Sequence, residues 1–222
     1  MAKKVSLNEN VLGRNNAVAA EVRDALSSRG ITMVNLLGSP GAGKTTLVEA
    51  LVKGGFFEPG SMAVIEGDLY TEQDALRMKA LGIQSVQINT EGACHLEADS
   101  VRRALGALDL DGVSLVVIDN VGNLVCTSEF LLGEHLRVGV SSVTEGNDKP
   151  TKYPLMFQTA DVVILNKADL VPCVDFDVSC FEVDVRSLNQ EAPIVVCSAS
   201  TGEGIEQLAR VLAAASIFDA NC

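Results

Sequence analysis

One segment has the residue types and spacing of a phosphate-binding loop. Residues 38–45 read GSPGAGKT, which fits G-x-x-x-x-G-K-S/T, and they lie between an apolar run and the start of a helical pattern. Glycines let consecutive backbone N–H groups point at phosphate oxygens, and a helix N-terminus adds positive potential. A glycine-rich turn that matches by chance is the alternative, but the strand-then-helix context argues against it. We expect nucleotide phosphates to contact Gly38, Ser39, Pro40, Gly41, Ala42, Gly43, Lys44, Thr45 and Thr46.

Five side chains or backbone groups would serve phosphate chemistry. Lys44 is expected to reach the β- and γ-phosphates, and the Thr45 hydroxyl to bind Mg²⁺. Asp68 and Asp119 each end a strand-like run, and the carboxyl ends of parallel strands line a ligand crevice. Asp119 opens the D-x-x-G spacing with Gly122, whose N–H would sense the γ-phosphate. We assign Lys44, Asp68 and Asp119 as catalytic and Thr45, Asp68 and Asp119 as Mg²⁺ ligands, although a lone aspartate also suits a solvated strand end.

The segment N166-K-A-D169 bears on which base is bound. A carboxylate at Asp169 can accept both the N1–H and the exocyclic amine of guanine, a donor pair that adenine does not present. Asn166 and Lys167 would brace the loop and pack along the base. An ordinary turn after a strand is the alternative, but the segment lies well downstream of the phosphate loop and is followed by C197-S-A-S200. We therefore expect GTP or GDP, with Ser198 and Ala199 in the same site. No glutamine stands out that would orient the attacking water, so slow intrinsic hydrolysis is expected.

Cys94, His95 and Cys126 form a candidate metal-ligand set. Cys94 and His95 are adjacent after a glycine-containing turn, and Cys126 lies a few residues beyond Gly122. Two thiolates and one imidazole are soft, incomplete ligands that suit Zn²⁺ or Ni²⁺, with one position left for water or a second chain. Cysteines that only fill space are the alternative. The closeness of Cys126 to the phosphate-sensing segment would couple metal affinity to the nucleotide state.

The remaining thiols and the second histidine are expected to have no ligand role. His135 suits a surface or structural position better than ligation. No histidine lies near the other cysteines in sequence, and we interpret them as packing or incidental: Cys173, Cys180, Cys197 and Cys222.

Alternating strand-like and helical patterns must position these residues. Such alternation predicts parallel β-α-β units, and near-continuous apolar runs indicate strands covered on both faces. We predict a three-layer α/β/α P-loop NTPase with a mostly parallel central sheet, as one domain over 1–222 with an N-terminal amphipathic helix within 1–30. The expected strands are 31–37, 63–68, 85–89, 115–120, 137–143, 161–167 and 193–199, and the expected helices are 11–29, 44 or 45 to 54, 71–81, about 95–108 and 204–215.

Composition excludes several classes of partner. With 29 acidic and 17 basic residues the formal charge is −12, which repels nucleic acid and anionic lipid, and no basic run offsets it. No apolar stretch approaches the ~20 residues that span a bilayer. The first residues, MAKKVSLNEN, lack the apolar region of a signal peptide. We expect a cytoplasmic protein with reduced thiols that binds neither nucleic acid nor membrane.

Several stretches resemble the HypB hydrogenase-maturation GTPases, which insert nickel into nickel-iron hydrogenase. The resemblance covers about residues 30–205 and rests on NLLGSPGAGKTTL, IEGDLYTEQDALR, QINTEGACHLEAD, NVGNLVC, SVTEGNDKPTKYP and ILNKADL. It implies a SIMIBI-type GTPase in which Cys94, His95 and Cys126 bind nickel or zinc at a GTP-dependent homodimer interface, with Asp68 and Asp119 near Mg²⁺. The family usually has Glu in place of Asp119. The implied partners are a nickel chaperone of the HypA type and the hydrogenase large-subunit precursor.

These observations predict a homodimerising GTPase metallochaperone that releases nickel on hydrolysis. One rival is a GTPase that serves another metallocentre, such as urease or a cobalamin enzyme. Urease service is disfavoured because the metal motif there is a Cys-Pro-His triplet, whereas Cys94 meets His95 directly. The other rival is a GTP-dependent interaction switch whose cysteines are structural.

Overall fold

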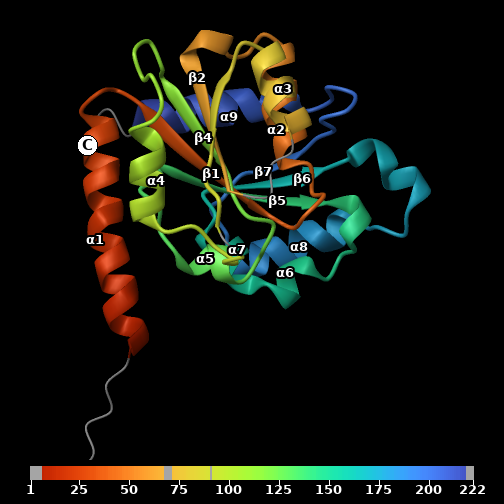
Figure 1. The fold of residues 1–222 in the computed structure, drawn as a ribbon. Coiled ribbons are helices and arrows are strands. Elements are labelled where there is room, and N and C mark those ends of the chain that lie inside the picture. The colour runs from red at the N-terminus through yellow and green to blue at the C-terminus, as the bar shows by residue number, and fades with distance from the viewer. Residues whose placement is uncertain (1–6, 68–71, 91, 219–222) are drawn as a thin grey trace, which may run out of the picture.

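A seven-stranded parallel sheet organises the protein (Figure 1). The computed structural model describes residues 7–67, 72–90 and 92–218. The strand order is β3-β2-β4-β1-β5-β6-β7, and every described strand pair is parallel, as predicted. The strands are β1 (Thr32–Gly38), β2 (Met62–Glu66), β3 (Gln84–Gln87), β4 (Leu115–Asp119), β5 (Leu136–Ser142), β6 (Val162–Asn166) and β7 (Ile194–Val196).

Helices cover both faces of the sheet. The α-helices are α1 (Leu7–Ser27), α2 (Lys44–Lys53), α3 (Glu72–Ala80), α4 (Ala98–Leu105), α5 (Cys126–Glu129), α6 (Lys149–Lys152), α7 (Pro154–Thr159), α8 (Val178–Leu188) and α9 (Ile205–Phe218). Short 3₁₀ helices occur at η1 (Pro59–Ser61), η2 (Val143–Glu145) and η3 (Ala168–Cys173). Among the described residues, no helix is long and apolar enough to cross a membrane.

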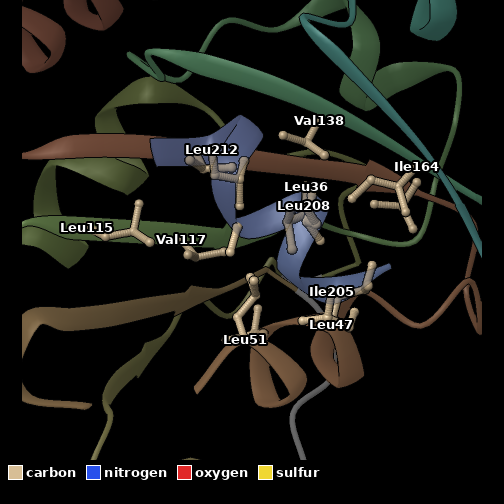
Figure 2. Close-up of a cluster of buried hydrophobic side chains, with 14 of the residues drawn as sticks. Leu36, Leu47, Leu51, Leu115, Val117, Val138, Ile164, Ile205, Leu208 and Leu212 are labelled. Carbon is tan, nitrogen blue, oxygen red and sulfur yellow. The ribbon is translucent and has the colours of Figure 1, made fainter. Parts of the chain in front are cut away.

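The core divides between the two faces because alternate strand residues point in opposite directions. Val34 and Leu36 of β1 pack toward α2 and α9, in the apolar cluster of Figure 2. Met33 belongs instead to a cluster with residues of α1 and α4, and Leu37 to one with residues of α7 and α8. The first cluster therefore covers one face of the sheet and the other two cover the opposite face, which gives the predicted α/β/α arrangement with the central strands buried on both sides.

The sheet register brings the ends of the central strands to one edge. Leu36 of β1 lies opposite Asp119 of β4, and Asp119 lies opposite Glu66 of β2. Gly38, the last residue of β1, lies opposite Val140 of β5. The phosphate-binding loop therefore begins beside the carboxyl ends of β4 and β2, where a nucleotide site is expected in a parallel sheet.

The described residues contain four helices that the pattern did not predict, three of them only four to six residues long. The pattern over 11–29 predicts α1 and the structure extends it back to Leu7, but α5, α6, α7 and α8 were not expected. Helices of four to six residues, such as α5 and α7, are too short to show a helical period. The predicted start of α4 near residue 95 is wrong, since the helix begins at Ala98 and leaves Cys94 and His95 in the preceding turn.

Candidate functional site

The phosphate-binding loop connects β1 to α2 with a backbone that requires glycine. Gly41 has φ 78° and Gly43, the N-cap of α2, has φ 97°, both in the left-handed region that favours glycine. A Cβ on Gly43 would also lie 2.3 Å from Nδ2 of Asn166. Any side chain at Gly43 would therefore strain the loop and push against a residue from the end of β6.

Lys44, Thr45 and Asp119 meet at the base of this loop. The Lys44 side chain is 7% exposed, and its Nζ donates to the carbonyl oxygens of Gly38 at 3.4 Å and Ser39 at 3.5 Å. The same Nζ lies 3.8 Å from Oδ1 of Asp119, and the Thr45 hydroxyl donates to Oδ2 of Asp119. A buried ammonium beside two hard oxygen donors suits a phosphate with its Mg²⁺. Asp68 lies outside the described residues, so the structure does not place it.

The D-x-x-G segment packs directly on the phosphate-binding loop. A Cβ on Gly122 would lie 2.6 Å from Cγ of Pro40 and 2.9 Å from its backbone nitrogen. The backbone at Gly122 therefore approaches the loop more closely than any other residue type would allow. A shift of either segment would therefore change its contact with the other.

The N166-K-A-D169 segment contacts the loop from the side of β6. Nδ2 of Asn166 donates to the Ala42 carbonyl at 2.9 Å, while its Oδ1 accepts from the Ala199 N–H at 3.1 Å. Lys167 has φ 61°, and its Nζ donates to the Gly41 carbonyl at 2.7 Å. Asp169 is exposed in η3. The structure therefore brings three predicted segments together, because Asn166 ties the phosphate-binding loop to the segment that holds Ser198 and Ala199.

Lys149 is a neighbour of this site that sequence reasoning did not assign. Its Nζ lies 3.4 Å from the Ser39 hydroxyl and 3.5 Å from Oε1 of Glu145. Glu145 is held by a capping box with Ser142, whose N–H donates to Oε2 of Glu145 at 2.9 Å. Two features of the sequence could have predicted this contact. Ser142 and Glu145 have the spacing of a capping box, and Lys149 follows Glu145 by four residues.

The candidate metal ligands come from two segments that meet at the surface. Sγ of Cys94 lies 3.7 Å from Nδ1 of His95. The pKa of the Cys126 thiol is raised, first because its side chain shares a hydrogen bond with Cys94 and then because of burial. Among residues 7–67, 72–90 and 92–218, however, no three His, Cys, Asp or Glu side chains converge closely enough to hold a metal ion. The three predicted ligands are therefore neighbours in pairs and form no closed set within one chain.

The residues around Cys126 hold its short helix in place. Oδ1 of Asn123 accepts from the N–H groups of Val125 at 2.8 Å and Cys126 at 3.1 Å. These hydrogen bonds give the first N–H groups of α5 an acceptor. Just after α5, the Phe130 ring stacks on the imidazole of His95 with centroids 3.9 Å apart. This stack joins the two ligand-bearing segments, and sequence reasoning did not find it.

A buried polar network runs from the nucleotide side to α5. Nδ2 of Asn120 donates to Oδ1 of Asn35 at 3.0 Å, and Nδ2 of Asn35 donates to Oε1 of Glu134 at 3.1 Å. Oε1 of Glu134 lies 3.3 Å from Nε of Arg137, and the Arg137 guanidinium donates to the Ser128 carbonyl in α5 at 2.8 Å. The buried ion pair is flanked by the hydrogen bonds from Asn35 and to Ser128, and the network thereby contacts α5, which begins at the predicted ligand Cys126.

The structure describes the second histidine and three of the other four cysteines. Nδ1 of His135 accepts from the Met33 N–H at 2.9 Å, and its Nε2 lies 2.9 Å from the Ser27 hydroxyl, so this buried ring is structural. Burial raises the pKa of the Cys197 thiol to about 12. Cys173 and Cys180 are exposed, and Cys222 lies outside the described residues.

Comparisons with known proteins agree with this geometry. The family profile "CobW/HypB/UreG, nucleotide-binding domain" matches residues 32–196. The hydrogenase maturation factor HypB of Azotobacter chroococcum is 45% identical over 206 residues, which cover 92% of this chain and 67% of that protein. The hydrogenase/urease maturation factor HypB of Helicobacter pylori is 39% identical over 214 residues, or 95% of this chain and 87% of that protein.

Solved structures give the same result. The crystal structure of HypB from Helicobacter pylori in complex with nickel superposes with a TM-score of 0.87 at 38% identity, covering 94% of this chain and 98% of that one. HypB from Archaeoglobus fulgidus gives 0.86 at 34% identity, covering 92% and 100%. The signal recognition particle protein of Aeropyrum pernix, at 15% identity and a TM-score of 0.57 over 82% of this chain and 46% of that one, shares the fold. The chain therefore belongs to the HypB family, within the CobW/HypB/UreG nucleotide-binding proteins.

Proposed function

We propose that this chain is a cytoplasmic GTPase that binds nickel as cargo and delivers it during maturation of nickel-iron hydrogenase. The observation that carries the proposal is the close packing of Gly122 on Pro40, because it places the segment ending at Cys126 directly against the phosphate-binding loop. The proposal draws further support from relatives named as hydrogenase maturation factors and from a HypB structure in complex with nickel.

The nucleotide half of the proposed mechanism uses the phosphate-binding loop and the residues predicted around it. The backbone N–H groups of 38–45 and the Lys44 ammonium bind the phosphates, and the Asp169 carboxylate selects guanine. Thr45 and Asp119, together with Asp68, would hold Mg²⁺, which when bound neutralises charge on the β- and γ-phosphate oxygens. The Gly122 N–H contacts the γ-phosphate and is released when that phosphate leaves. We expect slow intrinsic hydrolysis, because the sequence offers no obvious glutamine to orient the attacking water.

The cargo half is completed by a second subunit. Cys94, His95 and Cys126 supply two thiolates and one imidazole, a set that accepts Ni²⁺ or Zn²⁺ with positions left over. GTP-dependent pairing of two chains would bring two such sets together, and hydrolysis would loosen them. The nickel would arrive from a chaperone of the HypA type and leave to the hydrogenase large-subunit precursor.

Nickel titration of matched cysteine variants tests the cargo site. Cys94→Ala should lower nickel affinity by at least about ten-fold, since one thiolate ligand is lost. Cys180→Ala removes a cysteine that is also exposed but lies in α8, and it should leave affinity unchanged. GTP-analogue binding should persist in both variants. Equal nickel affinity and stoichiometry in wild type and Cys94→Ala would show that the cysteines are structural and favour the interaction switch.

A urease-serving role is a second candidate because one relative is named a hydrogenase/urease maturation factor. Reconstitution separates the two roles. The purified nickel-loaded protein should activate a hydrogenase large-subunit precursor and leave a urease apoprotein inactive. Activation of both would extend the role to urease, and activation of urease alone would overturn the hydrogenase assignment.

A further inference from the structure

A single buried amide on α1 joins the two segments that carry the proposed metal ligands. The Asn15 residue is 8% exposed. Its Nδ2 donates to the Leu131 carbonyl at 2.7 Å, in the segment that follows α5, and its Oδ1 accepts from the Ala98 N–H at 2.9 Å, at the start of α4. Cys126 begins α5, and Cys94 and His95 lie in the turn before α4. Asn15 therefore bridges the two ligand-bearing segments through both of its polar atoms.

Helix α1 is itself firmly attached next to these contacts. Gly133 approaches α1 so closely that a Cβ there would lie 2.8 Å from the Ala19 carbonyl. The Arg23 guanidinium donates to the Glu134 carbonyl at 2.7 Å. Figure 1 shows α1 running beside α4 on the side of the sheet away from α2. Asn15 thus projects from a fixed element, and it can hold the two segments at a set distance from each other.

The ligand-bearing segments also meet in the core, where Leu96, next to His95, and Leu132, just after α5, belong to one buried apolar cluster. At the surface the Cys94 and Cys126 thiols are neighbours, and the half-buried His95 and Phe130 rings stack. We propose that Asn15 is a positioning residue that sets the spacing between the Cys94–His95 turn and α5, and through it the affinity for nickel. The nickel part of this inference rests on the proposed function, whereas the spacing part does not.

Nickel affinity of matched asparagine variants tests the first part. Asn15→Leu removes both hydrogen bonds at similar volume and should weaken nickel binding about ten-fold, as loss of outer contacts around metal ligands does. Asn15→Asp keeps the acceptor for Ala98 but faces a carboxylate toward the Leu131 carbonyl, and should also weaken binding. GTP-analogue affinity should stay within about two-fold in both, because Asn15 lies outside the phosphate-binding loop.

Asn189→Leu is the control. Nδ2 of Asn189 donates to the Phe157 and Ala160 carbonyls at 2.9 and 2.8 Å, and its Oδ1 accepts from the Ala192 N–H at 3.0 Å. It bridges two segments as Asn15 does, but away from the metal ligands. Nickel affinity in Asn189→Leu should equal that of wild type. Unchanged affinity in Asn15→Leu, or an equal loss in Asn189→Leu, would overturn the positioning role.

Disulfide formation in the metal-free protein tests the spacing directly. Diamide takes two electrons and two protons from the Cys94 and Cys126 thiols, which become a disulfide while diamide becomes its hydrazine. Mass spectrometry should show this bond forming at least about three-fold more slowly in Asn15→Leu than in wild type or Asn189→Leu. The background replaces by serine the other cysteines that are exposed or undescribed: Cys173, Cys180 and Cys222.

The two experiments separate the two claims. Slower disulfide formation without any nickel binding by the wild type would leave the spacing role intact and refute the proposed cargo. Nickel binding that depends on Cys94 but not on Asn15, with unchanged disulfide formation, would refute the positioning role alone.

Discussion

The predicted nucleotide site and the predicted metal site are built in opposite ways. Lys44, Asp119 and Asn166 are buried, and each is fixed by contacts among the carboxyl ends of strands. Cys94 is exposed in a turn, and Cys126 begins a helix of four residues. The ends of the strands hold the phosphate-binding loop in one geometry. The positions of the thiols depend instead on contacts with α1, Phe130 and the buried network. Such a division suits a protein that must hold a nucleotide in one geometry and both accept and release a metal.

The largest expected effect comes from removing the charge that supports α5. Arg137→Met leaves the Glu134 carboxylate buried without its ion-pair partner, which should lower the free energy of unfolding by about 3 kcal/mol. Arg186 also donates to main-chain carbonyls but is exposed, and Arg186→Met should cost about 1 kcal/mol or less. Urea denaturation of both variants checks this. Equal stabilities would mean that the metal-bearing segment needs no buried support.

Loss of the phosphate-binding lysine should affect one region only. Lys44→Ala removes the buried ammonium that would reach the β- and γ-phosphates, and GTP hydrolysis should fall by at least about 100-fold. Nickel affinity without nucleotide should stay at the wild-type value, because the Lys44 ammonium contacts Gly38, Ser39 and Asp119 rather than the predicted nickel ligands. Phosphate release and nickel titration measure the two effects. Hydrolysis at the wild-type rate would refute the role of Lys44.

A smaller effect is expected from the aromatic stack on the metal side. Phe130→Leu removes the ring that packs on His95, and stacked pairs contribute about 0.5–1.5 kcal/mol. Nickel affinity should therefore fall by about three- to ten-fold. Phe56→Leu, at an exposed phenylalanine elsewhere, should leave it unchanged. Isothermal titration of the two variants side by side decides the matter, and equal affinities would show that the stack does not orient His95.

The last effect appears only at alkaline pH and concerns the buried cysteine beside the nucleotide segment. Burial raises the pKa of Cys197 from 9.0 to about 12, so the folded state disfavours the thiolate. The stability that Cys197 contributes is complete below pH 9 and is lost as the pH rises toward 12. Wild type should therefore lose more stability than Cys197→Ala between pH 8 and pH 10.5 in urea titrations. Parallel losses in both proteins would contradict this account.

Sequence reasoning succeeded where a feature is local. The phosphate-binding loop needs only its glycines, its lysine and the strand-helix context, and the strands are revealed by continuous apolar runs such as 162–165. Sequence reasoning failed where the local structure depends on a side chain far away in the sequence. At the start of α4, the Ala98 N–H donates to Oδ1 of Asn15, which lies 83 positions away in the sequence. The stack of Phe130 on His95 likewise joins segments that are separate in the sequence. Cys94, His95 and Cys126 stay predicted metal ligands, and the contacts that hold these residues in place were not predicted.

The most direct test of the account is the nickel affinity of the wild-type protein with a non-hydrolysable GTP analogue and with GDP, measured by equilibrium dialysis at equal Mg²⁺. If the phosphate-binding loop acts through Gly122 on the segment that ends at Cys126, the two affinities should differ by at least about five-fold. Equal affinities in the two nucleotide states would contradict the coupling of the nucleotide site to nickel delivery.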